Sequence, residues 1–367
     1  MESIKRNVLL NPGPATTTDS VKYAQVVPDI CPREKEFGDV MEFVSKELTN
    51  FVADNEKYTT VLFGGSGTAA VEAMLTSAVG EDYVLIINNG AYGKRMCEIA
   101  EAYCMNYIEF KSSPFEAVDL NALEEAIKQS KVKISHLAVI HHETTTGLLN
   151  DVKTLGQLCK KYAMDMIVDG MSSFAGMPIN MEEMNITYLA SSSNKCIQGM
   201  AGISFVIAKL DALIKLNDVK KRNYYLNLYQ QYEYFKKNYQ MRFTPPVQTL
   251  YALKQAIIEA KEETVEKRHE RYVKAWKTLV EGLDRLGLKY LVNPKDHSKL
   301  ITTVVEPESG MYNFDKMHDY LYERGYTIYP GKVSDLNTFR IANIGDLNYT
   351  DVEKFLTILE EYINTLK

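Results

Sequence analysis

Residues 188–195 read Tyr188-Leu189-Ala190-Ser191-Ser192-Ser193-Asn194-Lys195, and this stretch decides the fold together with Met166-Ile167-Val168-Asp169-Gly170. Each stretch begins as a short apolar run typical of a buried strand and ends in polar residues. Asp169 stands 26 residues before Lys195, which suits one strand-to-strand unit. Carboxyl ends of parallel strands meet at one edge of a sheet, so we expect this acid and this lysine to lie together.

The first half of the chain repeats this alternation of strands and helices. Further apolar runs predict strands at 60–63, 84–87, 137–140 and 203–207, and helical spacing is present at 120–127 and 152–162. Strands that alternate with helices predict an α/β fold with a mostly parallel sheet covered on both faces.

The pattern changes after residue 208. The tyrosine-rich residues 222–240 predict a helical excursion on the surface, and the helical region 247–286 is long enough to bend at a domain junction. The rest predicts a small α+β domain, with strands at 300–305 and 338–341 and helices at 314–323 and 351–366. We expect a large domain at 16–255 and a small domain at 256–367 together with 1–15.

Composition restricts the function. The 367 residues are 46% hydrophobic and carry a formal charge of -6 without a basic block, so nucleic acid is an unexpected partner. Five scattered cysteines favour neither a disulfide framework nor zinc, and they indicate a reducing compartment, the cytoplasm. Neither a signal peptide nor a membrane span is expected from the sequence.

Lys195 and Asp169 are the first candidates for chemistry. A desolvated lysine at a sheet edge can form a Schiff base with an aldehyde cofactor, whereas most lysines are solvated surface residues. An aspartate at the end of an apolar strand is costly to bury unless it meets a cation, although it can also cap the next helix. Together the two residues favour pyridoxal 5′-phosphate, whose ring nitrogen is such a cation.

Three further strand ends carry polar motifs. Phe63-Gly64-Gly65-Ser66-Gly67-Thr68 predicts a phosphate site at a helix start, and it lacks both the GxGxxG and the Walker pattern. Tyr92, between Gly90 and Gly93, can lie flat on an aromatic ring or fill the core. In the segment from His141 to Gly147, adjacent histidines on a strand point to opposite faces, which does not favour a metal site. The threonines of this segment are better interpreted as hydroxyls that face a polar ligand.

The chain resembles the class V aminotransferases of fold type I, and within them those that use 2-aminoethylphosphonate and pyruvate. The resemblance runs from Leu10-Asn11-Pro12-Gly13-Pro14 to the last helix, through 89–93, 143–147, 192–199, 329–332 and 339–345. It implies a mostly parallel sheet of the seven-stranded type and the transfer of an amino group from 2-aminoethylphosphonate to pyruvate, giving phosphonoacetaldehyde and L-alanine.

The resemblance also implies a role for each matching residue. Lys195 carries the cofactor and moves the proton, Asp169 meets the ring nitrogen, and Tyr92 stacks on the ring. Arg340 binds the carboxylate, and Asn11 and Gly13 belong to the substrate site. A homodimer with shared active sites is implied, because a neighbouring subunit supplies Thr244. The remaining cofactor contacts are the phosphate group Ser66, Gly67, Thr68 and Asn194, and Thr144 or Thr145 at the ring oxygen.

Other functions stay open on the sequence. Another transaminase of the same class, using glyoxylate with alanine or serine, or a phosphorylated amine, has similar motifs. A nicotinamide-dependent oxidoreductase would use the glycine loop but leave Asp169 and Lys195 without a role, and a scaffold protein would not need them. The chain departs from the family pattern at Pro245 and near Tyr225, which bears on the substrate and not on the cofactor.

Overall fold

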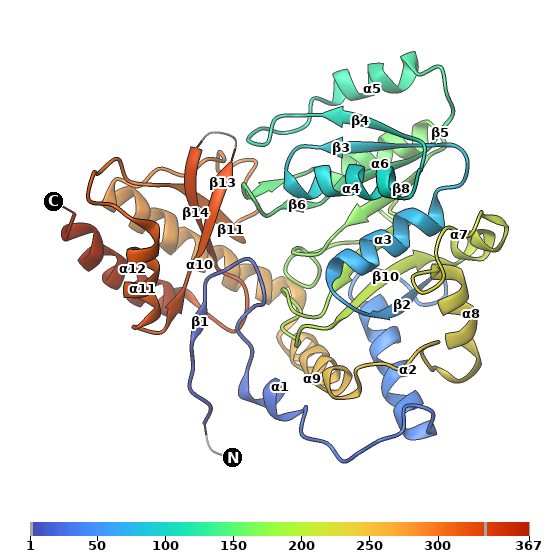
Figure 1. The fold of residues 1–367 in the computed structure, drawn as a ribbon, viewed down its shortest axis with the longest axis horizontal. Helices are drawn as coiled ribbons and strands as arrows, with labels where there is room; N and C mark the ends of the chain where they lie inside the picture. Colours follow the sequence, from blue (N-terminus) through green and yellow to red (C-terminus); the bar gives the residue numbers. More distant parts are fainter. Residues whose placement is uncertain (1–2, 334–335, 367) are drawn as a thin grey trace.

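The computed structural model describes residues 3–333 and 336–366 of the chain. Two α/β units lie side by side, the smaller at the left of Figure 1 and the larger at the right. Helix α10 (Val265–Leu286) of the small unit follows directly on α9 (Val247–Glu263) of the large one. This arrangement, with a mostly parallel sheet in the large unit, confirms the α/β fold expected from the sequence.

The large unit is built on a seven-stranded sheet in the order β2-β10-β9-β8-β5-β3-β4. Only β10 runs antiparallel to its neighbours. Strands covered on both faces read as continuous apolar runs, which is why the sequence locates most of them. The strands are β2 (Tyr58–Gly64), β3 (Tyr83–Asn88), β4 (Tyr107–Lys111), β5 (Ile134–Ile140), β8 (Asp165–Asp169), β9 (Tyr188–Ser192) and β10 (Ile203–Lys209).

Helices cover both faces of this sheet. One core lies under α2 (Lys35–Asn50), α5 (Leu120–Gln129), α6 (Val152–Lys161) and α9, and it also holds Phe174 and Phe205. The other core lies under α3 (Gly67–Ala78), α4 (Ala91–Ala102), α7 (Leu210–Lys215) and α8 (Leu228–Asn238). The short η1 (Leu216–Asp218) and α1 (Asp19–Tyr23) lie at the periphery, α1 against α9.

The small unit has its own sheet and core. Strand β14 (Leu336–Ala342) lies between β11 (Ile301–Val305) and β13 (Tyr329–Val333), and both pairings are antiparallel. Helices α10, α11 (Phe314–Tyr322) and α12 (Tyr349–Asn364) enclose a core that includes Val8 and Leu10. The N-terminal β1 (Val8–Leu9) pairs with β12 (Tyr326–Thr327), so the first residues belong with the small unit. A short hairpin of β6 (His142–Glu143) and β7 (Leu148–Leu149) lies beyond the large sheet.

The long helical region bends at Thr264, between α9 and α10. Thr264 has a φ of 68°, and its side chain accepts a hydrogen bond from the N–H of Lys267 to begin α10. Residues Leu253 and Ile257 of α9 both lie in the large core. The domain limit between 255 and 256 stays a prediction; the change from one core to the other takes place at the bend.

Two segments show where the sequence pattern was weak. Strand β4 was not predicted, because it is an edge strand with exposed Glu109 and Lys111 and so lacks a continuous apolar run. In the tyrosine-rich region only α8 is helical, with Tyr232 and Phe235 buried. Arg222 anchors the irregular part through hydrogen bonds to the carbonyls of Val79 and Gly80, at the end of α3.

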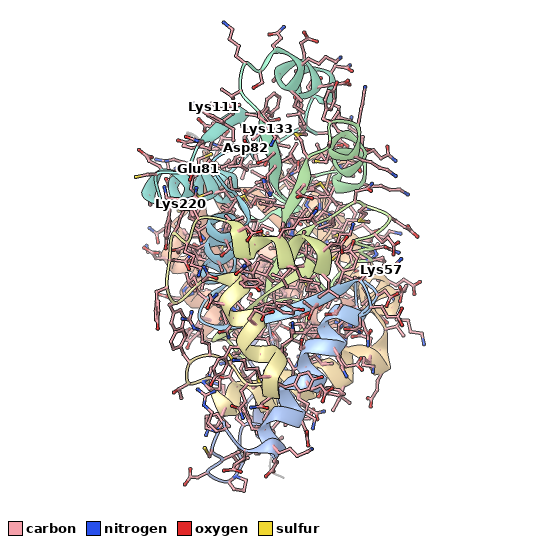
Figure 2. All side chains as sticks on the ribbon, turned by 90° about the vertical axis from the view of Figure 1, so that its right-hand side faces the viewer. Lys57, Glu81, Asp82, Lys111, Lys133 and Lys220 are labelled. Carbon is pink, nitrogen blue, oxygen red and sulfur yellow. The ribbon has the colours of Figure 1, made fainter. Side chains whose placement is uncertain are left out.

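Charged side chains at the surface form exposed ion pairs. Figure 2 labels Lys133 and Asp82, whose nearest charged atoms are 2.6 Å apart, and Lys220 and Glu81, which are 3.6 Å apart. Exposed pairs of this kind contribute at most about 1 kcal/mol each. The stability of the fold therefore rests on its two units' cores and not on this surface.

Candidate active site

A cavity of about 400 Å³ opens at the carboxyl ends of the parallel strands. Its lining brings together residues from five segments that are far apart in the sequence. Most of the predicted cofactor residues are among them. They are Ser66, Gly67, Thr68, Tyr92, Asp169, Asn194 and Lys195.

The start of α3 forms one wall of this cavity. Ser66 is the N-cap residue, but its side chain makes no capping hydrogen bond, and Gly67 and Thr68 of the first turn line the cavity. A Cβ on Gly67 would lie 2.4 Å from Sδ of Met171, so a larger residue here would displace that side chain. Main-chain N–H groups at the start of a helix attract an anion, so this wall suits a phosphate.

Lys195 lies half-buried against the N-terminal segment. Its Nζ donates a hydrogen bond to the carbonyl of Pro12 at 2.6 Å. A Cβ on Gly13 would lie 2.2 Å from the same nitrogen, so only glycine leaves room for the lysine. Asn11 is also buried, and its Oδ1 finds no hydrogen-bond partner within residues 3–333 and 336–366. Burial lowers the pKa of Lys195, which favours the neutral, nucleophilic amine.

Asp169 is the last residue of β8 and lines the same cavity. Its Oδ1 accepts a hydrogen bond from the N–H of Met171 at 2.8 Å, and the side chain is 5% exposed. Burial raises the pKa of Asp169 to about 6. A carboxylate that is desolvated in this way is stabilised when a cation binds beside it.

Tyr92 stands in the first turn of α4 above a second buried carboxylate. Glu143 accepts hydrogen bonds from the N–H of Tyr92 at 3.1 Å and from the hydroxyl of Thr145 at 2.7 Å. A Cβ on Gly90 would lie 2.4 Å from Cδ of Glu143, so the glycine makes room for the acid. Burial raises the pKa of Glu143. Glu143 therefore fixes the position of Tyr92, a role that the sequence motif did not reveal.

The threonines of this motif point in different directions. The hydroxyl of Thr145 is turned to Glu143 and not into the cavity. Thr144 lines a recess of about 20 Å³ shared with Tyr92, Asp169 and Lys195. Its buried Oγ1 has no hydrogen-bond partner in the described part of the chain. A ligand oxygen in the recess would satisfy that hydroxyl.

Arg340 and Thr244 lie outside the lining of this cavity in the described chain. Arg340, on β14, donates to the carbonyl of Pro330 at 3.0 Å and stacks 4.8 Å from the ring centre of Tyr329. Burial lowers its pKa, and its Nε has no partner among the residues that the structure describes. Thr244 lies on the exposed loop between α8 and α9.

Some lining residues were missed by the sequence analysis. Arg95 lies over the ring of Tyr92, 4.7 Å from its centre, and lines the cavity. It follows Tyr92 by three residues, and helical spacing could have revealed it because such residues share a face. The others gave no signal, since their side chains are apolar, small or common in loops. They are Val71, Met171, Ala201 and Gly202.

The paired histidines lie beside the site as buried, neutral groups. Nδ1 of His141 is 2.9 Å from Oγ of Ser173, and Nδ1 of His142 is 2.9 Å from Oγ of Ser172. Burial lowers the pKa of His141 to about 4. Cys196, beside the lysine, is fully buried, and burial raises its pKa to about 12, which suits a packing role.

Comparison with known proteins defines the class. Residues 18–334 match the family Aminotransferase class-V, and the chain belongs to that family. Among solved structures, an alanine–glyoxylate aminotransferase from a Nostoc species superposes with a TM-score of 0.89 at 25% identity, covering 98% of this chain and 96% of that one. The oxidoreductase and scaffold alternatives are thereby set aside. The chain is a transaminase with pyridoxal 5′-phosphate as its cofactor.

Two relatives narrow the comparison further. Over 356 residues the chain is 41% identical to the 2-aminoethylphosphonate–pyruvate transaminase of Salmonella paratyphi B, covering 96% of each protein. Over 361 residues it is 41% identical to a bifunctional phosphonoacetaldehyde hydrolase/aminoethylphosphonate transaminase of Clostridioides difficile, covering 97% of this chain and 56% of that protein. The chain thus spans only about half of the longer relative.

The residues in the cavity fit the family's cofactor. The helix start suits its phosphate, the partnerless hydroxyl of Thr144 suits its ring oxygen, and the buried carboxyl of Asp169 suits its protonated ring nitrogen. The described residues contain no group of side chains arranged to hold a metal ion. No helix in the described chain is long and apolar enough to cross a membrane.

Proposed function

We propose that this chain transfers the amino group of 2-aminoethylphosphonate to pyruvate, producing phosphonoacetaldehyde and L-alanine. The observation that carries the proposal is the 41% identity to a 2-aminoethylphosphonate–pyruvate transaminase over 96% of both chains. The same class contains transaminases with other donors, so the substrate rests on this identity and on the cations near the cavity.

Lys195 is the proposed catalytic group. When bound, pyridoxal 5′-phosphate supplies an electron sink that stabilises negative charge on the carbon bearing the amine. Lys195 would hold the cofactor and would carry a proton to and from that carbon. Desolvation lowers the pKa of the amine below its ordinary value, which favours the neutral base. The carbonyl of Pro12, 2.6 Å from Nζ, holds the amine in place.

The other cavity residues would hold and tune the cofactor. Asp169 would stabilise the charge on the ring nitrogen, and Tyr92 would pack against the ring. Thr144 is favoured over Thr145 at the ring oxygen, because its hydroxyl is unsatisfied whereas that of Thr145 is bonded to Glu143. The proposed phosphate contacts are Ser66, Gly67, Thr68 and Asn194.

Arg340 is the proposed anchor for the substrate's anionic group. Its half-buried guanidinium has a buried Nε without a partner among the described residues. A planar fork of N–H donors matches a carboxylate and can also bind a phosphonate oxygen. Asn11, with its unpaired buried Oδ1, and Gly13, packed on Lys195, would complete the substrate end of the site.

We further propose a cytoplasmic homodimer with shared active sites. Thr244, on the exposed loop, would reach the phosphate end of the neighbouring subunit's cavity. Beside it, Tyr225 stacks on Phe243 at 4.9 Å, and Tyr224 is 73% exposed under the guanidinium of Arg242. Exposed aromatic and arginine side chains are typical of interfaces. All five cysteines are free, as in a reducing compartment.

A half-reaction titration tests the substrate. The purified, cofactor-loaded protein is mixed separately with 2-aminoethylphosphonate, phosphoethanolamine, alanine and serine, and the cofactor's absorbance is followed. We expect conversion by 2-aminoethylphosphonate and by alanine, the product of the second half-reaction. Conversion by phosphoethanolamine or serine in their place would still be a transaminase reaction, but it would refute 2-aminoethylphosphonate as the amino donor.

A further inference from the structure

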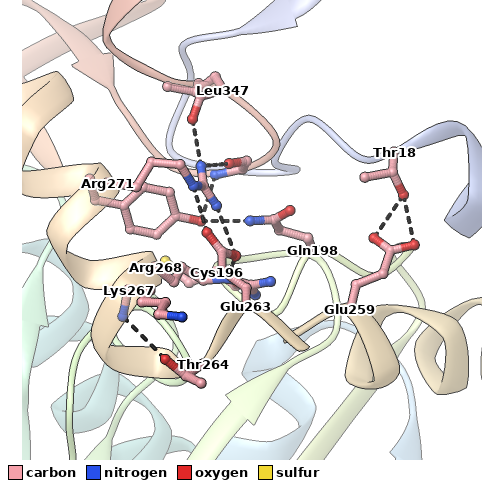
Figure 3. A network of polar contacts seen from close by, with 12 residues as sticks. Thr18, Cys196, Gln198, Glu259, Glu263, Thr264, Lys267, Arg268, Arg271 and Leu347 are labelled. Carbon is pink, nitrogen blue, oxygen red and sulfur yellow. Dashed lines mark hydrogen bonds and ion pairs between the residues drawn. The ribbon is translucent and has the colours of Figure 1, made fainter. Parts of the chain in front are cut away.

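The loop that follows Lys195 is held by a buried arginine from the other side of the domain junction. Nη1 of Arg268 donates a hydrogen bond to the carbonyl of Cys196 at 2.7 Å. Arg268 belongs to the first turns of α10 and is 2% exposed. The bond thus joins the residue next to the cofactor lysine to the helix that begins the small unit, as Figure 3 shows.

A shared carboxylate makes this buried cation tolerable. Oε2 of Glu263 accepts from Nε of Arg268 at 2.6 Å, and Oε1 accepts from Nε of Arg271 at the same distance. Burial alone would raise the pKa of Glu263, but the hydrogen bond from Arg271 and the charge of Arg268 hold it below its ordinary value. Glu263 therefore stays ionised and fixes both guanidinium groups.

Arg271 and Tyr272 extend the cluster into the small unit. Nη1 of Arg271 donates to the carbonyls of Gly345 and Leu347. The hydroxyl of Tyr272, which is fully buried, accepts from the N–H of Gly345 at 3.0 Å and from the side chain of Gln198 at 2.8 Å. The lysine loop and the 345–347 loop of the small unit are thus bonded to consecutive residues of one helix.

The lysine loop needs such an anchor. Gln198 takes a φ of 64°, in the left-handed region that non-glycine residues rarely adopt. Its N–H bonds the carbonyl of Lys195 at 2.8 Å in a tight turn. The carbonyl of Cys196 points out of this turn, so a buried donor is required to satisfy it. Arg268 supplies that donor.

We propose that Arg268 is a positioning residue for Lys195, fixing the peptide after the lysine and tying it, through Glu263 and Arg271, to the small unit. The inference rests on the proposed role of Lys195. It does not depend on which amine the enzyme accepts. A small displacement of a catalytic group costs up to about a hundredfold in rate, so this anchor contributes to turnover and not only to stability.

The test compares Arg268→Lys with Arg285→Met. Lysine keeps the charge, but it lacks the rigid fork by which Nε of Arg268 reaches Glu263 while Nη1 reaches the Cys196 carbonyl. Arg285 lies on the same helix, is exposed and stands 3.8 Å from Glu360, so its loss should change nothing in the lysine loop. Hydrogen–deuterium exchange of the amides in 195–199 is measured for the holoenzyme and for the cofactor-free protein, together with kcat, KM and the unfolding temperature.

We expect Arg268→Lys to exchange faster within 195–199 and to lose about 10- to 100-fold in kcat, with little change in KM. Arg285→Met should match the wild type. Two results would overturn the positioning role of Arg268. One is exchange at the wild-type rate in 195–199, and the other is faster exchange spread evenly over the chain together with a lower unfolding temperature. If 2-aminoethylphosphonate proves not to be the amino donor, the exchange result still tests the role of Arg268, because exchange is measured without substrate.

Discussion

Buried charge is handled in opposite ways in two regions of this molecule. In and beside the cavity, Lys195, Asp169 and Glu143 are bonded to neutral groups. These groups are a carbonyl, a main-chain N–H, and a hydroxyl with main-chain N–H groups. At the domain junction, Arg268 and Arg271 share the carboxylate of Glu263. In the first region the ionisable groups remain able to pair with a ligand, whereas in the second they are already paired within the protein.

The difference appears in the direction in which the pKa values move. Burial raises the pKa of Asp169 and Glu143 and lowers that of Lys195, so in each case the charged form is disfavoured. For Glu263 the paired arginines outweigh burial and lower the pKa. Groups whose charge is disfavoured until a partner arrives are typical of active sites. Groups that are already paired are typical of structural anchors, and four substitutions test this distinction.

The largest effect is expected for Lys195→Ala. The variant should lose at least about 10³-fold in transamination, because the cofactor attachment and the proton carrier disappear together. The cavity wall at Ser66 and Gly67 is unchanged, so some cofactor should remain after gel filtration. Steady-state turnover and cofactor content are the measurements. Wild-type turnover would refute the mechanism.

Asp169→Asn should have the next largest effect, and it should lower activity while raising the stability of the cofactor-free protein. Activity falls by about 100-fold or more, since the ring nitrogen loses its charged partner. The cofactor-free variant is more stable than the wild type at pH 7. Because the folded pKa is raised from 3.8 to about 6, the stability that this group contributes is present below pH 3.8 and lost as pH rises through 6.

At pH 7 the free energies of unfolding of the two cofactor-free proteins should differ by roughly 1–3 kcal/mol, since a change of one pKa unit corresponds to about 1.4 kcal/mol. Urea unfolding at a series of pH values from neutral down to the ordinary pKa of an aspartate measures this difference. It should shrink steadily towards the acidic end. Equal stabilities at every pH would mean that Asp169 is already paired, and the contrast between the two regions would be lost.

The sequence predicted what local patterns determine. Apolar runs located the strands, and residues at their carboxyl ends met in one cavity because parallel strands must end at a common edge. Asp169 and Lys195 come together for this reason. Strand β4 was not predicted because it lies at the edge of the sheet and carries exposed charges. The break between α9 and α10 could be located only from the positive φ of Thr264 in the structure.

Contacts between distant segments could not be predicted in this way. Nothing in the sequence near Arg268 shows that it bonds the carbonyl of Cys196, 72 residues away. The closeness of Gly13 to Lys195 likewise depends on how the N-terminal segment crosses the junction. The sequence could not distinguish Thr144 from Thr145 as the residue that bonds the ring oxygen. The structure shows that Thr145 bonds Glu143, whereas the hydroxyl of Thr144 has no partner in the described chain.

Glu143→Gln should have a moderate effect. Both carboxylate oxygens accept hydrogen bonds, one from Tyr92 and the other from Thr145, and an amide replaces one acceptor with a donor. One buried N–H is then left unpaired, at a cost of about 1–3 kcal/mol in the free energy of unfolding. Activity should fall by up to about tenfold as Tyr92 shifts. Wild-type stability and kcat together would show that Glu143 does not hold the tyrosine.

The smallest effect is expected for Lys133→Met, which removes an ion pair as short as those of the junction. Nζ of Lys133 is 2.6 Å from Asp82, the distance found between Arg268 and Glu263, but its side chain is 78% exposed and that of Arg268 only 2%. Water and salt screen the exposed pair, so the unfolding temperature should change by less than about 2 °C. Arg268→Lys should lower it further and also slow turnover. If the two variants unfolded alike and turned over alike, burial would not be what separates an anchoring pair from a surface pair in this protein.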